Sequence, residues 1–206
     1  MKRKISLSLT LLFFSITVLL AQKSADDSIS KRCFVSTSAF MLYNFVDDPE
    51  PPSFYQLNLG YRITSKDILI VEAITWKYYA PIGIPYGLSY GDTSQNFPGY
   101  ARNFGVGLAY QRFLWKGLYS TLHITPFVQQ YFSPDKVKIQ TGFQLFTTLR
   151  LGYHLNLFKD RFFIEPSVAC TYWPINTNMP ESFAVQEDKW PNYFLFEPGF
   201  HVGFNF

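Results

Sequence analysis

A strict alternation of large apolar residues with small or polar ones is the feature that most constrains this chain. In the last eleven residues, every even position from Phe196 to Phe206 carries an apolar side chain. The odd positions between them hold Glu197, Gly199, His201, Gly203 and Asn205. Successive side chains of a β-strand point to opposite faces. The segment is therefore predicted to be a strand with one apolar and one polar face.

The same alternation returns along most of the chain. It is clear in segments 54–63, 103–113, 140–154 and 161–173, and weaker at 33–45, 67–79 and 118–131. With the last segment these make eight strands, each near or above the length needed to cross a bilayer at a tilt.

The connections between these segments alternate between short and long. The short ones are 64–67, 114–117 and 156–160, and the long ones are 46–52, 80–102, 132–139 and 174–192. Barrels that cross outer membranes have short periplasmic turns and longer external loops. A soluble lipid-carrying barrel, the competing architecture, needs an apolar inner face. The predicted fold is all-β: a closed antiparallel eight-stranded transmembrane β-barrel, an up-and-down meander over 32–206.

The first 21 residues predict the compartment. Lys2, Arg3 and Lys4 precede an uncharged apolar stretch at 5–20, and Ala21 ends it, which is typical of a cleavable secretory signal peptide. A single membrane-anchoring helix is the alternative, but the stretch is short for one. Residues 22–31 are predicted to be a flexible periplasmic N-terminal tail. The net charge of +3 equals these three cations, so nothing basic remains to suggest a nucleic-acid partner.

The alternating strands and the terminal Phe206 resemble the small outer-membrane barrels of the OmpA/OmpX type, and the Ala21-Gln22 junction gives the chain a Bacteroidota-like flavour. The resemblance implies the outer membrane of a Gram-negative bacterium, contact with outer-membrane lipid and lipopolysaccharide, and partner outer-membrane proteins. Barrels of this type serve as structural anchors, adhesins, lipid-A-modifying enzymes or subunits of larger assemblies. No specific functional family is indicated, and no cofactor is implied.

The alternation places a set of charged side chains inside the barrel. They are Arg62, Glu72, His123, Arg150, Glu165, Glu197 and His201. An eight-stranded barrel is just wide enough to be filled by its side chains, so we expect a charge-paired plug rather than a channel. A tight hairpin centred near Leu157–Phe158 would set Arg150 opposite Glu165. The alternative is an acid–base or metal site built from His123, His201, Glu165 and Glu72.

The external loops 80–102 and 174–192 are the predicted seat of specific function. Their large side chains form a candidate contact surface: Tyr86, Tyr90, Phe97, Tyr100, Met179, Phe183 and Trp190. Alternatively, these loops fold over the barrel mouth, with Trp173, Trp190 and Tyr193 in the interfacial girdle. We expect a non-enzymatic structural or interaction subunit. The alternative is a lipid-A-modifying acyl hydrolase or acyl transferase, although no histidine lies outward or in these loops.

Three prolines and two cysteines complete the expectations. Pro126, Pro166 and Pro198 fall inside predicted strands and are interpreted as bulges or local bends. Cys33 and Cys170 lie on the outer face of non-adjacent strands, which predicts two free, buried thiols rather than a disulfide.

Overall fold

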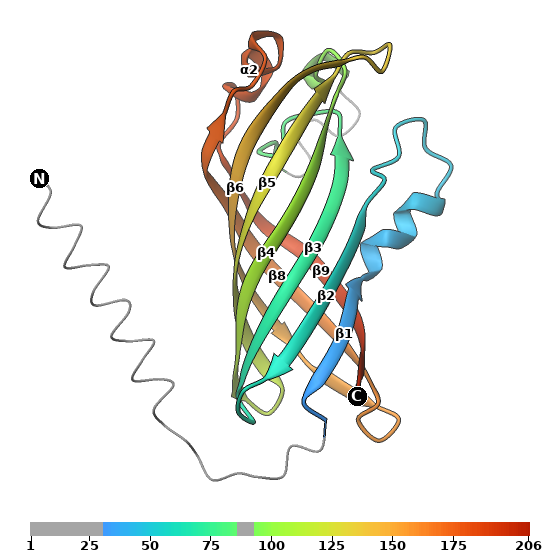
Figure 1. The fold of residues 1–206 in the computed structure, drawn as a ribbon, viewed down its shortest axis with the longest axis vertical. Helices are drawn as coiled ribbons and strands as arrows, with labels where there is room; N and C mark the ends of the chain where they lie inside the picture. Colours follow the sequence, from blue (N-terminus) through green and yellow to red (C-terminus); the bar gives the residue numbers. More distant parts are fainter. Residues whose placement is uncertain (1–30, 86–92) are drawn as a thin grey trace, which may run out of the picture. The chain divides into compact units, whose positions relative to one another are not determined.

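A computed structural model describes residues 31–85 and 93–206 (Figure 1). The predicted signal peptide, all but one residue of the predicted N-terminal tail, and loop residues 86–92 lie outside the described residues. Within the described ranges, no helix has the length and apolar content needed to cross a membrane.

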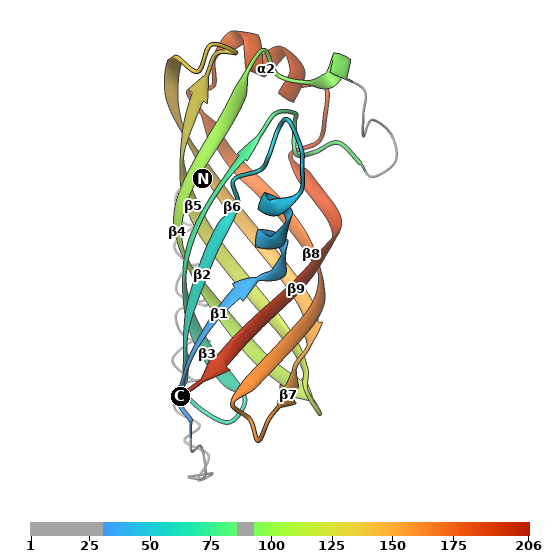
Figure 2. The same cartoon turned by 90° about the vertical axis from the view of Figure 1, so that its right-hand side faces the viewer.

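The described chain forms a ring of antiparallel strands (Figures 1 and 2). The strands are β1 (Cys33–Ser38), β2 (Tyr55–Arg62), β3 (Asp67–Tyr78), β4 (Tyr100–Trp115), β5 (Leu118–Phe132), β6 (Lys138–Tyr153), β7 (Leu155–Leu157), β8 (Phe162–Thr177) and β9 (Tyr193–Asn205). Strands β1 to β6 pair in chain order, β1 also pairs with β9, and β8 pairs with β6, β7 and β9. Since the short β7 continues β6 and pairs with the same strand, the two count as one, and the ring has eight strands. The predicted fold class is confirmed.

Three helical segments lie between strands in the described chain: η1 (Ala39–Phe45), η2 (Thr93–Gln95) and α2 (Glu181–Glu187). All belong to the long connections, whereas the turns at 63–66, 116–117 and 158–161 are short. The end of the barrel that carries α2 is called the upper end here, and the end with the short turns the lower end (Figure 1). The predicted alternation of short and long connections is therefore present.

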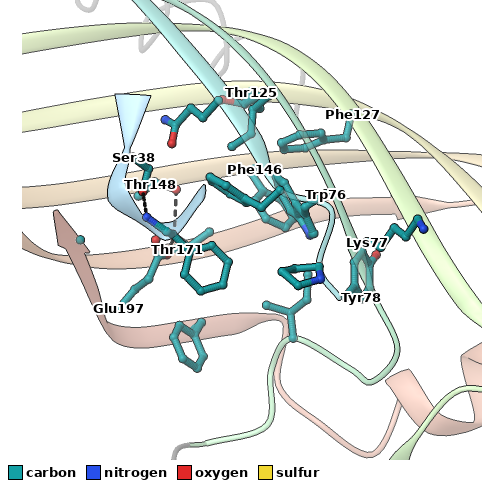
Figure 3. Close-up of a pocket in the computed structure, with 18 of the residues that line it drawn as sticks. Ser38, Trp76, Lys77, Tyr78, Thr125, Phe127, Phe146, Thr148, Thr171 and Glu197 are labelled. Carbon is teal, nitrogen blue, oxygen red and sulfur yellow. Dashed lines mark hydrogen bonds between the residues drawn. The ribbon is translucent and has the colours of Figure 1, made fainter. Parts of the chain in front are cut away.

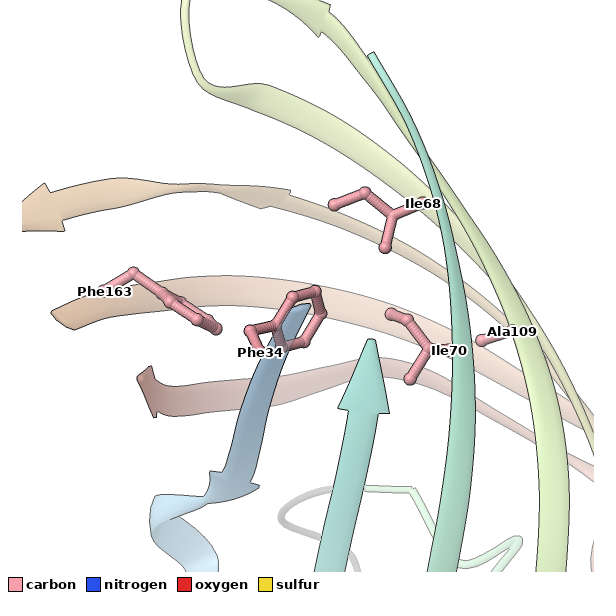
Figure 4. Packing of buried hydrophobic residues seen from close by; sticks show 5 residues of the cluster. All are labelled: Phe34, Ile68, Ile70, Ala109 and Phe163. Carbon is pink, nitrogen blue, oxygen red and sulfur yellow. The ribbon is translucent and has the colours of Figure 1, made fainter. Parts of the chain in front are cut away.

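The interior is layered rather than uniformly polar. Near the lower end, Phe34 and Phe163 meet edge to face with ring centroids 5.3 Å apart, and Ile68, Ile70 and Ala109 pack around them (Figure 4). This apolar layer closes the lower end, and it corrects the expectation of an entirely polar interior. The alternation at 67–79 was weak because Ile68 and Ile70 face inward between outward-facing apolar neighbours.

The first strand is shorter than the sequence predicts. Segment 33–45 is a strand only to Ser38, whose side chain accepts a hydrogen bond from the Phe40 N–H and so caps η1. The Asn44 side chain then holds the backbone of Phe54 from both sides, at 2.6 and 2.8 Å. These side-chain bonds replace the strand ladder that the alternation alone would favour. In Figure 2, β1 stops below the upper end of β9, and η1 follows it.

The three strand prolines do not shift the register of their strands. Pairing of β4 with β5 skips the rungs around Pro126, and pairing with β8 passes from β6 to β7 around Pro166. Pro198 stays in register with Val168. The bulge in this region lies higher on β9, where Phe196 has a positive φ of 59°. Of the expected bulges or local bends, no bulge falls at a proline, because a missing N–H removes a rung but adds no residue.

The cysteines are free, as predicted, because β9 separates their strands. Cys33 is half-buried and Cys170 is exposed on the outer face, so the expectation that both thiols are buried is wrong for Cys170. Its side chain contacts whatever surrounds the barrel wall.

Candidate functional site

A cavity of about 570 Å³ occupies the upper half of the barrel (Figure 3). Its floor is the polar middle of the barrel, and its walls are aromatic and aliphatic. The walls include Ile74, Trp76, Phe127, Phe146 and Phe194. The volume lies within the range of small-molecule sites. The upper half of the barrel is therefore not filled by side chains, which corrects the expectation of a plug throughout the interior.

The walls of the cavity are held by ring–ring contacts. Trp76 meets Phe127 edge to face at 4.7 Å between centroids, and Phe127 meets Phe146 in the same way at 5.0 Å. Behind them Trp173 stacks on Phe146 at 5.4 Å and is 1% exposed. The expectation that Trp173 lies in the interfacial girdle is therefore wrong, because alternation from Thr171 turns its indole inward. These contacts fix the rings before any ligand arrives.

An ion pair crosses the floor of the cavity. Arg150 donates to Glu197 at 3.1 Å and to the Ser167 hydroxyl at 3.0 Å, while Thr171 donates to the second oxygen of Glu197 at 2.9 Å. The guanidinium lies against Gly199, where any larger residue would meet its Nη1 atom. A glycine at this point of β9 leaves room for the Arg150 guanidinium, which extends from β6 past β8.

A second acidic group lies on the same floor. Glu72 is buried and accepts hydrogen bonds from Gln56 at 2.7 Å and from Thr125 at 3.0 Å. Its Oε2 lies 3.8 Å from Nδ1 of His123. His201 is buried and lines the same cavity. Four polar side chains that the sequence placed inside, together with Arg150, thus share one floor.

The other two predicted interior charges lie lower in the barrel. Glu165 accepts from Gln111 at 3.2 Å and pairs with His154 at 2.7 Å, not with Arg150. Strand register places Ala169 opposite Arg150, so the expected Arg150–Glu165 pair is wrong. Arg62 donates to Asn205 at 3.1 Å and its guanidinium lies over the ring of Phe34.

The quartet proposed for acid–base or metal chemistry is thus divided between two levels, because Glu165 belongs to the lower one. Among residues 31–85 and 93–206, no group of three or more potential His, Cys, Asp or Glu ligands is gathered for a metal ion.

The loops pack their large side chains into a buried cluster at the upper end of the barrel, called the roof here, instead of an exposed contact surface. Phe97 and Phe183 stack at 4.8 Å, and Phe183 meets Tyr131 at 5.2 Å. Phe97 is 5% exposed and Phe183 is 0% exposed, and Met179 packs against them. The expectation that these side chains are exposed is wrong, because they pack on the inner face of β4 and β5 at its upper end.

The remaining predicted contact residues have different places. Tyr86 and Tyr90 lie outside the described residues. Tyr100 begins β4 and stacks on Phe132 at 4.8 Å, and Trp190 is half-buried beyond α2. Exposed apolar residues of the long connections include those of η1, above all Phe45, which is 86% exposed, and Val185 of α2, which is 59% exposed. The short segment after β1 gave no sequence signal for this, since its alternation resembles that of a strand.

One acidic residue belongs to the roof itself. Glu187 ends α2, and one of its carboxylate oxygens is buried with no hydrogen-bond partner among the described residues. Burial raises the pKa of Glu187 to about 7, and the neighbouring charge of Asp188 adds to the rise. The roof thus contains a carboxyl group that titrates near neutral pH.

Comparisons with known proteins are sparse. A scan against protein-family models found no match, and a search of curated proteins found none either. A solved structure that resembles this chain is the crystal structure of Ail, the attachment invasion locus protein of Yersinia pestis, in complex with the heparin analogue sucrose octasulfate. The two chains are 11% identical, with a TM-score of 0.41 over 85% of this chain and 94% of that one. A likeness this distant leaves the function to be inferred from the residues of this chain.

Proposed function

We propose that this chain is an outer-membrane barrel of a Gram-negative bacterium with a binding or structural role at the cell surface and no catalytic one. The observation that carries the proposal is the outward belt of exposed apolar side chains. It includes Leu57, Leu59, Val71, Val106, Leu108, Ile124, Val128, Leu149, Leu151 and Phe200. A belt of this kind around a polar middle matches lipid outside the wall. It is bordered by exposed aromatic rings below (Tyr61, Tyr153, Phe162) and above (Tyr55, Tyr172, Tyr193).

The upper end is proposed to face the cell exterior, because it carries the long connections. Outer-membrane lipid and lipopolysaccharide then surround the barrel wall and η1, where Leu42, Phe45 and Val46 are exposed. Partner outer-membrane proteins would meet the same end. The recognition elements of this end are therefore η1, the roof and the cavity beneath it.

Cysteine labelling in intact cells tests both the membrane position and the orientation. In a background with Cys33→Ala and Cys170→Ala, we introduce Ser182→Cys on exposed α2 and, separately, Lys66→Cys in a short lower turn. A membrane-impermeant maleimide is expected to label only the first variant in whole cells and both in lysed cells. Labelling of both in whole cells, or recovery of the protein in the soluble fraction, would refute the proposal.

A lipid-modifying enzyme remains the second candidate because of one pair of residues. Ser38 and His201 are opposite each other in the β1–β9 ladder, both are buried, and both line the cavity. Side chains at such positions lie on one face, within reach of each other. A hydroxyl beside an imidazole can attack an ester carbonyl while the imidazole takes the proton and returns it to the leaving alcohol; water then releases the acyl group.

Mass spectrometry of lipids separates the two candidates. The refolded full chain is incubated with phospholipid and lipid A, and free fatty acid is measured. A binding protein releases none. Release that is lost in Ser38→Ala but kept in Ser36→Ala, a buried serine on the same strand outside the cavity, would establish the enzyme.

A further inference from the structure

The upper cavity reaches the side of the barrel where β1 is missing. β1 ends at Ser38, opposite His201, while β9 continues to Tyr193, and within the described residues no strand pairs with this upper part of β9 on that side. Two residues on the outer surface nevertheless line the cavity, namely Pro198 on the outward face of β9 and the half-exposed Phe40 of η1. The cavity is therefore bordered on this side by an opening between β9 and η1.

The sequence of β9 suits an unpaired edge at this height. The N–H of Asn205 is donated to Arg161, on the β8 side, and that of Phe206 to Cys33, on the β1 side. Because the direction alternates along a strand, the nitrogen of residue 198 faces the β1 side. Proline has no N–H, so Pro198 leaves no unsatisfied donor at an edge that no strand covers. The sequence of β9 is therefore compatible with an unpaired edge, and so with an opening, at Pro198.

The height of this opening matches the proposed lipid belt. On β9 the outward residues beside it include Phe200, and on β2 they include Leu57, both exposed. The rim itself is apolar, with Phe40 and Phe54 on one side and Phe194 and Pro198 on the other. A hydrocarbon chain can pass such a rim without desolvating a polar group.

The floor beneath the aromatic walls holds one guanidinium, that of Arg150, whose N–H groups are not all paired. Arg150 gives two of its five N–H groups to Ser167 and Glu197, and its Nε has no acceptor among the described residues. The carboxylates already receive bonds: Glu197 from Arg150 and Thr171, and Glu72 from Gln56 and Thr125. A ligand group that accepts hydrogen bonds can therefore pair with the guanidinium of Arg150, which bonds most strongly to a negatively charged acceptor.

We propose that the cavity binds one long-chain fatty acid. Its carboxylate lies on the floor against Arg150, and its chain follows Trp76 and Phe146 before leaving between β9 and η1 into the surrounding hydrocarbon. The polar floor, the aromatic walls and the apolar side opening then each contact the matching part of one molecule. This assignment rests on the proposed membrane position of the barrel, because the side opening has a purpose only if lipid lies outside it.

Equilibrium binding of radiolabelled palmitic acid to the refolded full chain in detergent tests the proposal, with empty micelles as background. The methyl ester and a long-chain alkylamine are the matched probes. One saturable molecule of acid per barrel is expected, with the ester about tenfold to a hundredfold weaker, since a charged hydrogen bond is lost. Tighter binding of the amine, or equal binding of acid and ester, would overturn the assignment.

Two variants locate the site. Thr148→Phe places a ring in the cavity, and Thr147→Phe places the same ring on the outer face of the same strand. The first should abolish saturable binding and the second should not. The pair Arg150→Met/Glu197→Gln, which removes both members of the ion pair, should bind acid and ester equally. Acid binding that survives in Thr148→Phe refutes the site. Retention of binding by a protein that fails the cysteine-labelling test would refute the membrane proposal and not the fatty-acid site.

Discussion

Replacing Phe183 by alanine should release the roof while leaving the barrel intact. The ring is fully buried and makes two aromatic contacts, at 4.8 Å to Phe97 and 5.2 Å to Tyr131. Truncation of a buried phenylalanine costs about 3–5 kcal/mol. A seven-residue helix has little stability of its own, so the loss should fall on the local docking of α2 and not on the strand ladders.

Hydrogen exchange measures this local stability directly. Within α2 the amides of Ala184 and Asp188 are bonded to Pro180 and Ala184, at 3.0 and 2.9 Å. A loss of 3 kcal/mol should speed their exchange by roughly a hundredfold, while amides of β5 and β6 keep their rates. Val185→Ala is the matched control, since Val185 is on the same helix and 59% exposed. Unchanged exchange in Phe183→Ala, or an equal effect of Val185→Ala, would show that the ring does not hold the roof.

Three further results are expected. Burial raises the pKa of Glu187 to about 7, above its usual 4.5, so between these pH values the closed roof keeps a proton that the open roof releases. Closure of the roof should therefore be most stable below pH 4.5 and lose at most about 3 kcal/mol as pH rises through 7. Hydrogen exchange of α2, corrected for intrinsic rates, should show this pH dependence in the wild type and not in Glu187→Gln. Gly60→Val should crowd the ring of Phe34 and cost about 1–3 kcal/mol in denaturant unfolding, and Phe34→Ala should relieve part of that cost; additive losses would contradict the contact. Arg150→Met should destabilise the barrel by about 1–3 kcal/mol by removing the cation beside the partly exposed Glu197, and adding Glu197→Leu should restore most of it, as thermal unfolding would show.

The architecture was predictable because each long strand repeats the same alternation. A strand that slips by one residue exchanges its faces, so Gln56, Glu72 and Arg150 had to lie inside once the outer face was assigned. Inward orientation therefore followed from parity alone. Distances between these side chains did not follow, because they depend on the registers of several ladders at once.

The clearest error in the predicted strand register is at the last short turn, between β7 and β8. The sequence favoured a hairpin centred near Leu157, whereas Phe158, Lys159 and Asp160 all adopt positive φ values, and the centre falls about two residues later. Non-glycine residues rarely adopt that conformation, so a turn of this kind is usually recognised in a sequence by a glycine, and this turn contains none. Because of this shift, Glu165 pairs with His154 and Arg150 pairs with Glu197.

The end of the first strand and the roof escaped prediction for related reasons. Ser38 stops a strand only because its hydroxyl caps η1, which alternation does not report. Phe97 and Phe183 have the same residue type whether they are exposed or buried, and only their meeting over β4 and β5 decides between the two. The local alternation thus predicted the strands of the barrel wall, but neither the early end of β1 nor the packing of the roof.

The short first strand also bears on how this barrel assembles. β1 and β9 join the two ends of the described chain through five residue pairs, whereas β5 and β6 share fifteen. Bringing distant segments together costs chain entropy, so local hairpins should form first and this seam last. The final step of assembly then forms far fewer residue pairs than the β5–β6 hairpin does, and the seam is where the finished protein should open most often. A brief widening of this β1–β9 seam would let a lipid chain enter beside Pro198.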